Sequence, residues 1–235
     1  MKEIEYLKKY LPKDKLKQGI QKLKEGKPVQ YIIGNVDFYN VNLLVNKNVL
    51  IPRFETEYLV EKTINYAKKL KEPLDILDIG TGTGAIAISL AKNLSCNVLA
   101  TDISKKAIEV AKENAKRNNV KINFKQSDIL KNIQGKFDII ISNPPYIAKD
   151  EKIDPLVKNN EPHIALYADN NGLYFYEEIL KNIKPHLKEK SIIAFEIGMT
   201  QSEEITKIAN KYLPKAKIIT EKDLAQKNRY IFIFV

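Results

Sequence analysis

Short runs of Ile, Val and Leu alternate with amphipathic segments along most of the chain after residue 74. Such runs are typical of parallel strands, because helices on both sides of a parallel sheet bury both faces of each strand. We therefore predict seven strands, which read in chain order DILDIG, NVLATD, KINFKQ, FDIIIS, SIIAFEIG, AKIITE and RYIFIFV. Helices are predicted over residues 84–92, 104–117, 172–187 and 200–213, and Ser104 is expected to cap the second of them.

The last two predicted strands are joined by a short polar segment that has no room for a crossover helix. They are therefore expected to pair as an antiparallel hairpin. A doubly wound sheet with this ending resembles the Rossmann-like class I methyltransferases, whereas a typical dinucleotide dehydrogenase lacks it. The expected fold is α/β, with a doubly wound, seven-stranded sheet and an antiparallel C-terminal hairpin.

The first 50 residues have a different pattern, and we expect them to form a small appendage. Residues 1–27 predict one or two short basic helices, because apolar residues recur there at helical spacing. Residues 28–50 predict a β-hairpin, since β-rich runs are interrupted by Gly34-Asn35. The main domain is then expected over residues 51–235.

Residues 51–70 predict a loop that leads into a helix. Glu55 or Thr56 is expected to cap this helix. Its apolar face is expected to contain Leu59, Thr63, Ile64 and Ala67. The charged residues at its start, Arg53, Glu55 and Glu57, are either helix-start charges or part of a site for a cofactor or substrate.

Composition narrows the class of protein. The chain has 235 residues, 44% of them hydrophobic, which suits one domain of ordinary size with a sizeable core. We find no apolar run near the ~18 residues of a membrane span and no signal-peptide pattern, so a cytoplasmic location is expected. The single cysteine, Cys96, has no metal-ligand spacing around it, so neither a disulfide nor a metal site is predicted. The net charge of +10 suits an anionic partner, but the lysines are scattered, which makes nucleic acid the less favoured partner.

A glycine-rich loop, DIGTGTGAIAISLA, joins the first predicted strand of the main domain to a helix. Glycine lets the backbone turn tightly and approach a ligand, and the start of a helix offers unpaired N–H groups. Asp102 closes the next strand, where a carboxylate is placed to accept hydrogen bonds from ribose hydroxyls. The loop residues that we expect to bind a cofactor are Gly80, Thr81, Gly82, Thr83 and Gly84. This loop alone also fits a dinucleotide, but the terminal hairpin favours S-adenosylmethionine.

The segment SDIL follows the third predicted strand. In this architecture an acidic residue there reaches the adenine amino group, and the next side chain packs on the adenine ring. Asp128 and Ile129 are therefore predicted to line the adenine pocket. A helix cap at Ser127 or Asp128 explains the same residues equally well.

The tetrapeptide Asn-Pro-Pro-Tyr, residues 143–146, follows the fourth predicted strand and so faces the cofactor. Asn143 and the backbone of Pro144 each offer a carbonyl oxygen, and neither Pro144 nor Pro145 has a competing N–H. Two rigid acceptors aimed at one point suit a planar –NH2 group, and Tyr146 can lie against its flat face. The tetrapeptide predicts methylation of an amino group and says little about which one.

Six segments resemble the HemK/PrmC family of protein-glutamine N5-methyltransferases, and they occur in the family's order. They are PVQYIIG, IPRFETEYLVE, DIGTGTGAIAISLA, SNPPYI, EPHIALYADNNGLYFYEEI and FEIGMTQ. The resemblance implies that residues 80–84, Asp102, Ile129 and Asn143 bind S-adenosylmethionine. It also implies that residues 143–146 hold the glutamine of the Gly-Gly-Gln loop of a class-1 peptide chain release factor.

Three features depart from the family's usual pattern. Only 27 residues precede Pro28, whereas the family usually has a longer helical N-terminal domain, so docking of the release factor is expected to be weaker or to use another surface. Phe54 stands where proline is common, and Ile129 stands where an aromatic residue is frequent. None of these differences falls on residues 143–146.

Three other functions remain open from the residues alone. The first is methylation of adenine N6 in DNA or RNA, which uses the same tetrapeptide and needs a surface that binds nucleic acid and flips out a base. The second is a binding module that keeps the cofactor fold without catalysis. The third is a dinucleotide oxidoreductase, which a cofactor-binding titration would separate from a methyltransferase.

Overall fold

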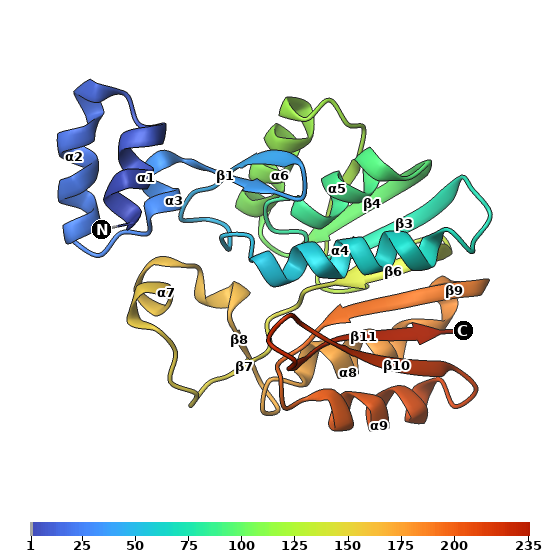
Figure 1. Cartoon of the computed structure of the whole chain (residues 1–235). Coiled ribbons are helices and arrows are strands. Elements are labelled where there is room, and N and C mark those ends of the chain that lie inside the picture. The colour runs from blue at the N-terminus through green and yellow to red at the C-terminus, as the bar shows by residue number, and fades with distance from the viewer. Residues whose placement is uncertain (1) are drawn as a thin grey trace.

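The computed structural model describes residues 2–235, and its centre is one seven-stranded sheet. Along the sheet the strands follow the order β10-β11-β9-β6-β3-β4-β5 (Figure 1). The strands are β3 (Leu74–Ile79), β4 (Cys96–Asp102), β5 (Asn123–Gln126), β6 (Phe137–Ser142), β9 (Leu187–Glu196), β10 (Lys217–Lys222) and β11 (Asn228–Phe234). Six of them point in the same direction, and β11 is antiparallel to both of its neighbours, β9 and β10. The predicted strands, the doubly wound order and the terminal hairpin are all confirmed.

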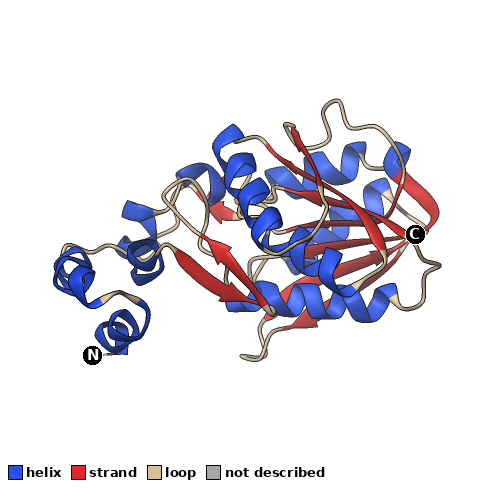
Figure 2. Ribbon diagram, turned by 90° about the horizontal axis from the view of Figure 1, so that it is seen from above, coloured by secondary structure: helices blue, strands red, loops and turns tan. Residues whose placement is uncertain are grey.

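Helices cover both faces of the sheet, as Figure 2 shows from above. The five helices that cover the sheet are α4 (Phe54–Ala67), α5 (Ala85–Asn93), α6 (Lys105–Arg117), α8 (Tyr174–Asn182) and α9 (Ser202–Tyr212). Successive strand residues point to opposite faces, so Ile76 packs in the core beneath α4 and α5, while Leu77 packs in the core beneath α8 and α9. Because both faces of the sheet are covered by helices, the residues on either side of the central strands are mostly apolar.

The N-terminal segment contains three helices, α1 (Lys2–Tyr10), α2 (Lys13–Lys24) and α3 (Val29–Ile33), which lie beside the sheet domain (Figure 1). They are followed by a hairpin of β1 (Asn35–Phe38) and β2 (Val41–Leu44), which contributes side chains to the main core. The domain division at residue 50 stays a prediction. No helix in residues 2–235 is long and apolar enough to cross a membrane.

The predicted hairpin over residues 28–50 is wrong for its first part. Residues 29–33 are helix α3, because Gly34 takes the left-handed conformation (φ 86°) and its N–H closes the helix on the carbonyl of Gln30. The hairpin begins only after this glycine, and its turn lies at Tyr39 and Asn40, which both have positive φ. The β-branched residues of this segment therefore misled the prediction.

The predicted cap of α4 is also wrong. The helix begins at Phe54, with Arg53 as an extended N-cap residue that makes no side-chain cap. Thr56 lies inside the first turn, and its hydroxyl is used elsewhere. The predicted apolar face of α4 is confirmed, because Leu59, Thr63, Ile64 and Ala67 are buried. The cap at Ser104 is confirmed as well, since its Oγ accepts a hydrogen bond from the Ala107 N–H at 3.2 Å.

A long segment between β6 and α8 carries short elements that the pattern did not predict. They are β7 (Ile147–Ala148), α7 (Pro155–Asn160), the 3₁₀ turn His163–Ala165 and β8 (Tyr167–Ala168); a second 3₁₀ turn, Lys184–His186, follows α8. Strands β7 and β8 pair in parallel as a separate two-stranded sheet. This segment lies over the ends of the strands that carry the candidate site.

Candidate active site

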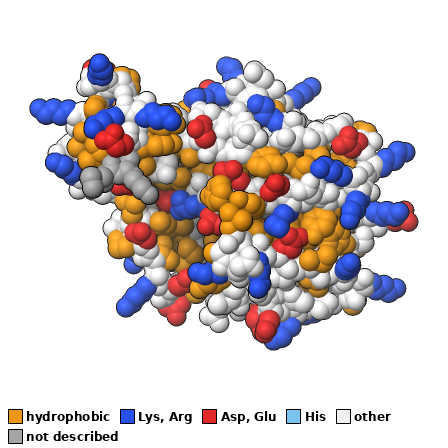
Figure 3. Space-filling view, viewed as in Figure 1, with side chains coloured by type: hydrophobic (Ala, Val, Ile, Leu, Met, Phe, Trp, Pro, Cys, Tyr) orange, Lys and Arg blue, Asp and Glu red, His pale blue; other side chains and the backbone are white. Residues whose placement is uncertain are grey.

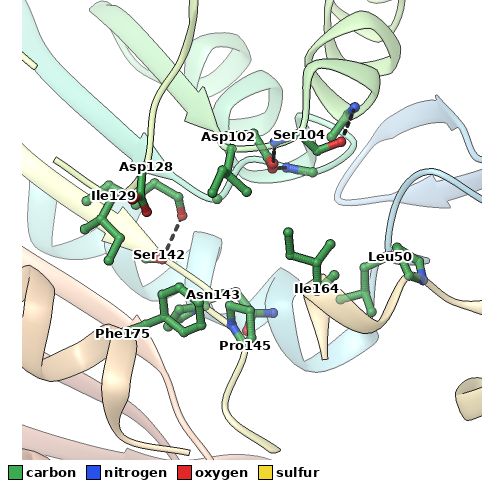
Figure 4. Close-up of a pocket in the computed structure, with 18 of the residues that line it drawn as sticks. Leu50, Asp102, Ser104, Asp128, Ile129, Ser142, Asn143, Pro145, Ile164 and Phe175 are labelled. Carbon is green, nitrogen blue, oxygen red and sulfur yellow. Dashed lines mark hydrogen bonds between the residues drawn. The ribbon is translucent and has the colours of Figure 1, made fainter. Parts of the chain in front are cut away.

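A cavity of about 320 Å³ opens at the carboxyl ends of β3, β4 and β6. Its volume lies within the range of about 300–1,000 Å³ that is usual for small-molecule sites. In Figure 4, Asp102 and Ser104 lie on one side of the cavity, and Asn143, Pro145 and Phe175 lie on the opposite side. The fold therefore brings together residues that are far apart in the sequence.

Two glycines of the loop after β3 form part of the cavity wall. Gly80 has φ 73° and Gly82 has φ 55°, so both take a conformation that other residues adopt at a cost. A Cβ at either position would meet no other atom within 4 Å, as expected where the backbone borders open space. The loop is fixed to β4, because the N–H groups of Gly80 and Thr81 both donate to the carbonyl of Thr101.

The other three loop residues lie outside the lining of this cavity. Thr81 is buried and donates its hydroxyl proton to Asp78 Oδ2 at 2.6 Å. The carbonyl of Thr83 accepts a hydrogen bond from Asn114 Nδ2, and a Cβ at Gly84 would meet Ile88 Cδ1 at 3.1 Å. These residues hold the loop against α5 and α6, and their predicted contact with a cofactor stays a prediction.

Asp102 lies in the cavity wall at the end of β4. Its Oδ2 accepts a hydrogen bond from the Gly82 N–H at 2.9 Å, and its Oδ1 accepts one from the Ser104 N–H at 2.8 Å. Burial raises the pKa of this carboxyl, while these backbone hydrogen bonds oppose the rise. Each oxygen can accept a further hydrogen bond, so the carboxylate fits a ligand that carries hydroxyl groups.

Asp128 and Ile129 also line the cavity, and Ile129 closes one end of it in Figure 4. The alternative reading of a helix cap is wrong, because residues 127–132 form turns and no helix starts there. The Ser127 hydroxyl lies instead 2.7 Å from the carbonyl oxygen of Lys131, to which it donates, and 3.1 Å from that of Ile129. Ile164 and Phe175 add apolar surface that the sequence did not single out.

A second cavity of about 210 Å³ adjoins the first on the far side of Asn143 and Pro144. These two residues line both cavities, together with Leu50 and Ala165. Pro145 lines only the first cavity, and Tyr146 lines only the second. The four residues of the tetrapeptide therefore form the boundary between two neighbouring spaces.

The surface is hollowed near this boundary. Figure 3 shows a hollow bordered by hydrophobic side chains between the N-terminal helices and the segment that carries α7. Ile153 and Val157 from that segment line the second cavity, as does Arg53. Glu55 and Glu57, the other two charged residues singled out at the start of α4, line neither cavity.

Arg53 is held by a buried acid. Its Nη2 lies 2.6 Å from Glu161 Oε1, and Glu161 Oε2 accepts a hydrogen bond from the Ile51 N–H at 3.0 Å. Glu161 is only 5% exposed, so the pair joins the loop before α4 to the segment after α7. The pair holds Arg53 in the wall of the second cavity, which Glu161 itself does not line.

Two residues that the sequence did not assign to the site, Thr56 and Glu196, are linked to Asn143 by hydrogen bonds, and Glu196 also lines the second cavity. Asn143 Nδ2 donates to Thr56 Oγ1 at 3.1 Å, and Thr56 Oγ1 donates to Glu196 Oε2 at 2.6 Å. Thr56 and Glu196 are 5% and 2% exposed, and burial raises the pKa of Glu196 to about 7. The sequence did hold a clue to Glu196, because it ends an apolar strand. A carboxyl group buried at such a position needs a hydrogen-bond partner.

The fold and the paired cavities define a class I methyltransferase, and a family model described as the methyltransferase small domain matches residues 57–160. The release factor glutamine methyltransferase of Streptococcus pneumoniae is 44% identical over 216 residues, which cover 91% of this chain and 77% of that protein. The protein of the same name from Lactococcus lactis is 43% identical, with 91% and 79% covered. The chain belongs to the release factor glutamine methyltransferase family.

A solved structure agrees with this membership. The protein-(glutamine-N5) methyltransferase (release factor-specific) from Alicyclobacillus acidocaldarius is 26% identical, with a TM-score of 0.51, and the match covers 81% of this chain and 97% of that chain. The resemblance seen in the sequence is therefore confirmed. The chain is an S-adenosylmethionine-dependent enzyme, and the adenine, non-catalytic and oxidoreductase alternatives are not favoured.

Proposed function

We propose that this enzyme methylates the side-chain nitrogen N5 of the glutamine in the Gly-Gly-Gln loop of class-1 peptide chain release factors. The observation that carries the proposal is the position of Asn143 and Pro144 in the wall shared by two cavities. One cavity has the features of a cofactor site, and the other would receive the substrate side chain. The activity would act on translation termination in the cytoplasm.

The residues of the larger cavity fit S-adenosylmethionine. Asp102 would accept hydrogen bonds from the ribose, Asp128 and Ile129 would contact the adenine, and Gly80 and Gly82 would let the backbone approach the ligand. When bound, this cofactor supplies a methyl group that is electrophilic because it is attached to a positively charged sulfur. Asn143 then lies where it can contact both the cofactor and the substrate amide.

The tetrapeptide prepares the substrate nitrogen. An amide nitrogen is a poor nucleophile, because its lone pair is delocalised into the carbonyl group. The side-chain oxygen of Asn143 and the carbonyl of Pro144 would accept its two hydrogens, which orients the lone pair toward the larger cavity. Tyr146, half-buried in the wall of the second cavity, would support the flat face of the amide. Orientation of this kind lowers a reaction barrier by several kcal/mol, and by up to about 7–11 kcal/mol in the best cases.

The second cavity suits a glutamine that follows two glycines. A side chain enters a cavity of about 210 Å³ only if its neighbours do not block the approach of the backbone. The two glycines of a Gly-Gly-Gln loop have no side chains to do so. The N-terminal helices border the hollow in Figure 3, and residues 1–50 would therefore form an appendage beside the entrance to the catalytic domain, residues 51–235.

The test is incubation of a purified class-1 release factor with this enzyme and S-adenosylmethionine, followed by intact-mass and peptide analysis. We expect one added methyl group, on the glutamine of the Gly-Gly-Gln loop, and none on a release factor in which that glutamine is alanine. Total RNA and DNA are incubated in parallel with a labelled methyl group. Label in nucleic acid with none in the release factor would overturn the proposal.

A further inference from the structure

The proposed role of Asn143 requires one particular rotation of its side-chain amide. An amide presents an oxygen on one side and an –NH2 group on the other. Only the oxygen can accept a hydrogen from the substrate amide, and the opposite rotation would set two –NH2 groups against each other. Something in the protein must therefore distinguish the two ends of this side chain.

We infer that Thr56 and Glu196 are positioning residues that fix the rotation of the Asn143 amide, so that its Oδ1 faces the substrate. This inference rests on the proposed function, because it gives Asn143 an acceptor role. Thr56 lines neither cavity, whereas Glu196 also lines the second cavity. Thr56 acts through its hydrogen bond with Asn143, and Glu196 acts through its hydrogen bond with Thr56.

The direction of the hydrogen bonds follows from the single proton of a hydroxyl group. Thr56 Oγ1 donates that proton to Glu196 Oε2 at 2.6 Å, so it has only lone pairs left for Asn143. Asn143 must then offer its Nδ2 to Thr56, at 3.1 Å, and turn its Oδ1 the other way. In its ionised form Glu196 can only accept, and this form sets the direction of both hydrogen bonds.

Both supporting groups are held by the fold. Thr56 lies in the first turn of α4, and the Tyr230 hydroxyl on β11 donates to the carbonyl of the preceding residue, Glu55, at 2.8 Å. Glu196 ends β9, and its own carbonyl accepts a hydrogen bond from the buried Tyr176 hydroxyl at 2.8 Å. The side chains therefore have little freedom to move with Asn143.

Burial of Glu196 is otherwise unfavourable. A carboxyl group with 2% exposure loses its hydration, and a hydrophobic residue would fill the end of β9 at lower cost. The charge of Arg229 and the hydrogen bond from Thr56 favour the ionised form. The positioning role explains why an ionisable group stands at this place.

The test compares substitutions at the two buried positions. Thr56→Val keeps the shape of the side chain and removes the hydroxyl, whereas Thr56→Ser keeps the hydroxyl. We expect Thr56→Val and Glu196→Gln to lower kcat for release factor methylation by about tenfold or more, with the Kd for S-adenosylmethionine changed by less than about threefold. Thr56→Ser should stay within about threefold of wild type.

The same helix supplies a matched control. Thr63 is also fully buried in α4, and its hydroxyl donates only to the carbonyl of Leu59 at 2.7 Å. Thr63→Val should leave kcat unchanged, and it should lower the melting temperature by about as much as Thr56→Val does. Equal losses of kcat in Thr56→Val and Thr63→Val would show a general structural effect and overturn the inference.

A double-mutant cycle separates this inference from the proposed function. If Thr56 acts only through Asn143, then Thr56→Val has no further effect on the residual rate of Asn143→Ala. A wild-type rate in Thr56→Val, together with an inactive Asn143→Ala, would overturn the positioning role and leave the function intact. Failure of the wild-type enzyme to methylate any release factor would overturn the proposed function itself.

Discussion

Gly172 lies directly against the main-chain carbonyl of Tyr146, and a Cβ at Gly172 would stand only 2.0 Å from that oxygen. Gln201 Nε2 donates to the same carbonyl at 2.9 Å and to the carbonyl of Asn171 at 3.3 Å. The turn before α8 and the start of α9 thus hold the last residue of the tetrapeptide in place. No atom larger than hydrogen can be added at Gly172 without moving Tyr146.

Gly172→Ala should therefore impair catalysis more than stability. Its φ of 82° costs an alanine about 1–2 kcal/mol, and the new methyl group additionally displaces Tyr146. We expect kcat for release factor methylation to fall by about tenfold or more, since small displacements of positioning groups have large effects on rate. Steady-state kinetics and thermal unfolding measure the two effects separately.

Gly135→Ala is the matched control for this prediction. Gly135 also has a positive φ, 98°, but its Cβ would meet nothing closer than Phe137 Cζ at 3.9 Å. The control should lose only the stability that the positive φ costs an alanine, and it should keep the wild-type rate. If both variants keep full activity, Tyr146 does not need the position that the structure gives it.

Asn143→Ala should abolish most turnover while cofactor binding persists. The substitution removes one of the two acceptors proposed for the substrate amide, and loss of one such preorganised group typically lowers kcat by about 10²–10³. The proposed contacts of the cofactor with Gly80, Gly82 and Asp102 do not involve the substituted side chain. Calorimetric titration with S-adenosylmethionine, alongside release factor kinetics, checks both parts, and turnover at the wild-type rate would remove Asn143 from the mechanism.

Asp102→Ala should have the opposite effect. The carboxylate has a proposed role in ribose binding, and it also ties down the N–H groups of Gly82 and Ser104. A hydrogen bond to a charged group contributes about 1.5–3 kcal/mol, so we expect the Kd for S-adenosylmethionine to rise by about tenfold or more. An unchanged Kd would contradict the role in ribose binding.

The sequence predicts the parts of the site that are local motifs at strand ends. The glycine loop, Asp102 and residues 143–146 each follow an apolar run, and parallel strands bring their carboxyl ends to one edge of the sheet. The sequence could not predict the contact between Thr56 and Glu196, because it depends on how α4 packs against β9. Local pattern favoured a cap for Thr56, and tertiary packing overrode it.

The same limit applies to the N-terminal segment. Residues 29–33 are rich in β-branched residues, and their propensity favoured a strand. The structure makes them a helix that ends at Gly34 and presents Val29 to the interior. A short segment of this kind takes its conformation from its neighbours, so its own pattern is a weak guide.

Glu161→Gln should loosen the wall of the second cavity. The substitution keeps the shape of the side chain but removes the charge that pairs with Arg53 at 2.6 Å in a buried setting. We expect the free energy of unfolding to fall by about 1.5–3 kcal/mol and KM for the release factor to rise. Glu204→Gln, which breaks an exposed ion pair with Lys207, is the control and should leave both quantities unchanged. An unchanged KM in Glu161→Gln would show that the wall does not contact the substrate.

Asp78 should make the enzyme less stable as pH rises through the acidic range. Its carboxyl is fully buried beneath the glycine loop, and its Oδ1 has no hydrogen-bond partner among residues 2–235. Burial raises its pKa from 3.8 to about 7. Between these values the folded protein holds a proton that the unfolded chain has lost, so the free energy of unfolding falls as pH rises from about 4 to about 7 and then levels off.

Asp78→Asn removes this titration and keeps the size of the side chain. We expect the free energy of unfolding of the variant to fall less steeply than that of wild type as pH rises from 4 to 8. Some decline should remain in the variant, because the pKa of Glu196 is also raised in the folded protein. Thr81→Val removes a hydrogen bond that lowers the pKa of Asp78, and should extend the decline to higher pH. Urea unfolding at a series of pH values measures all three profiles. Parallel profiles for wild type and Asp78→Asn would mean that Asp78 does not hold a proton in the folded protein.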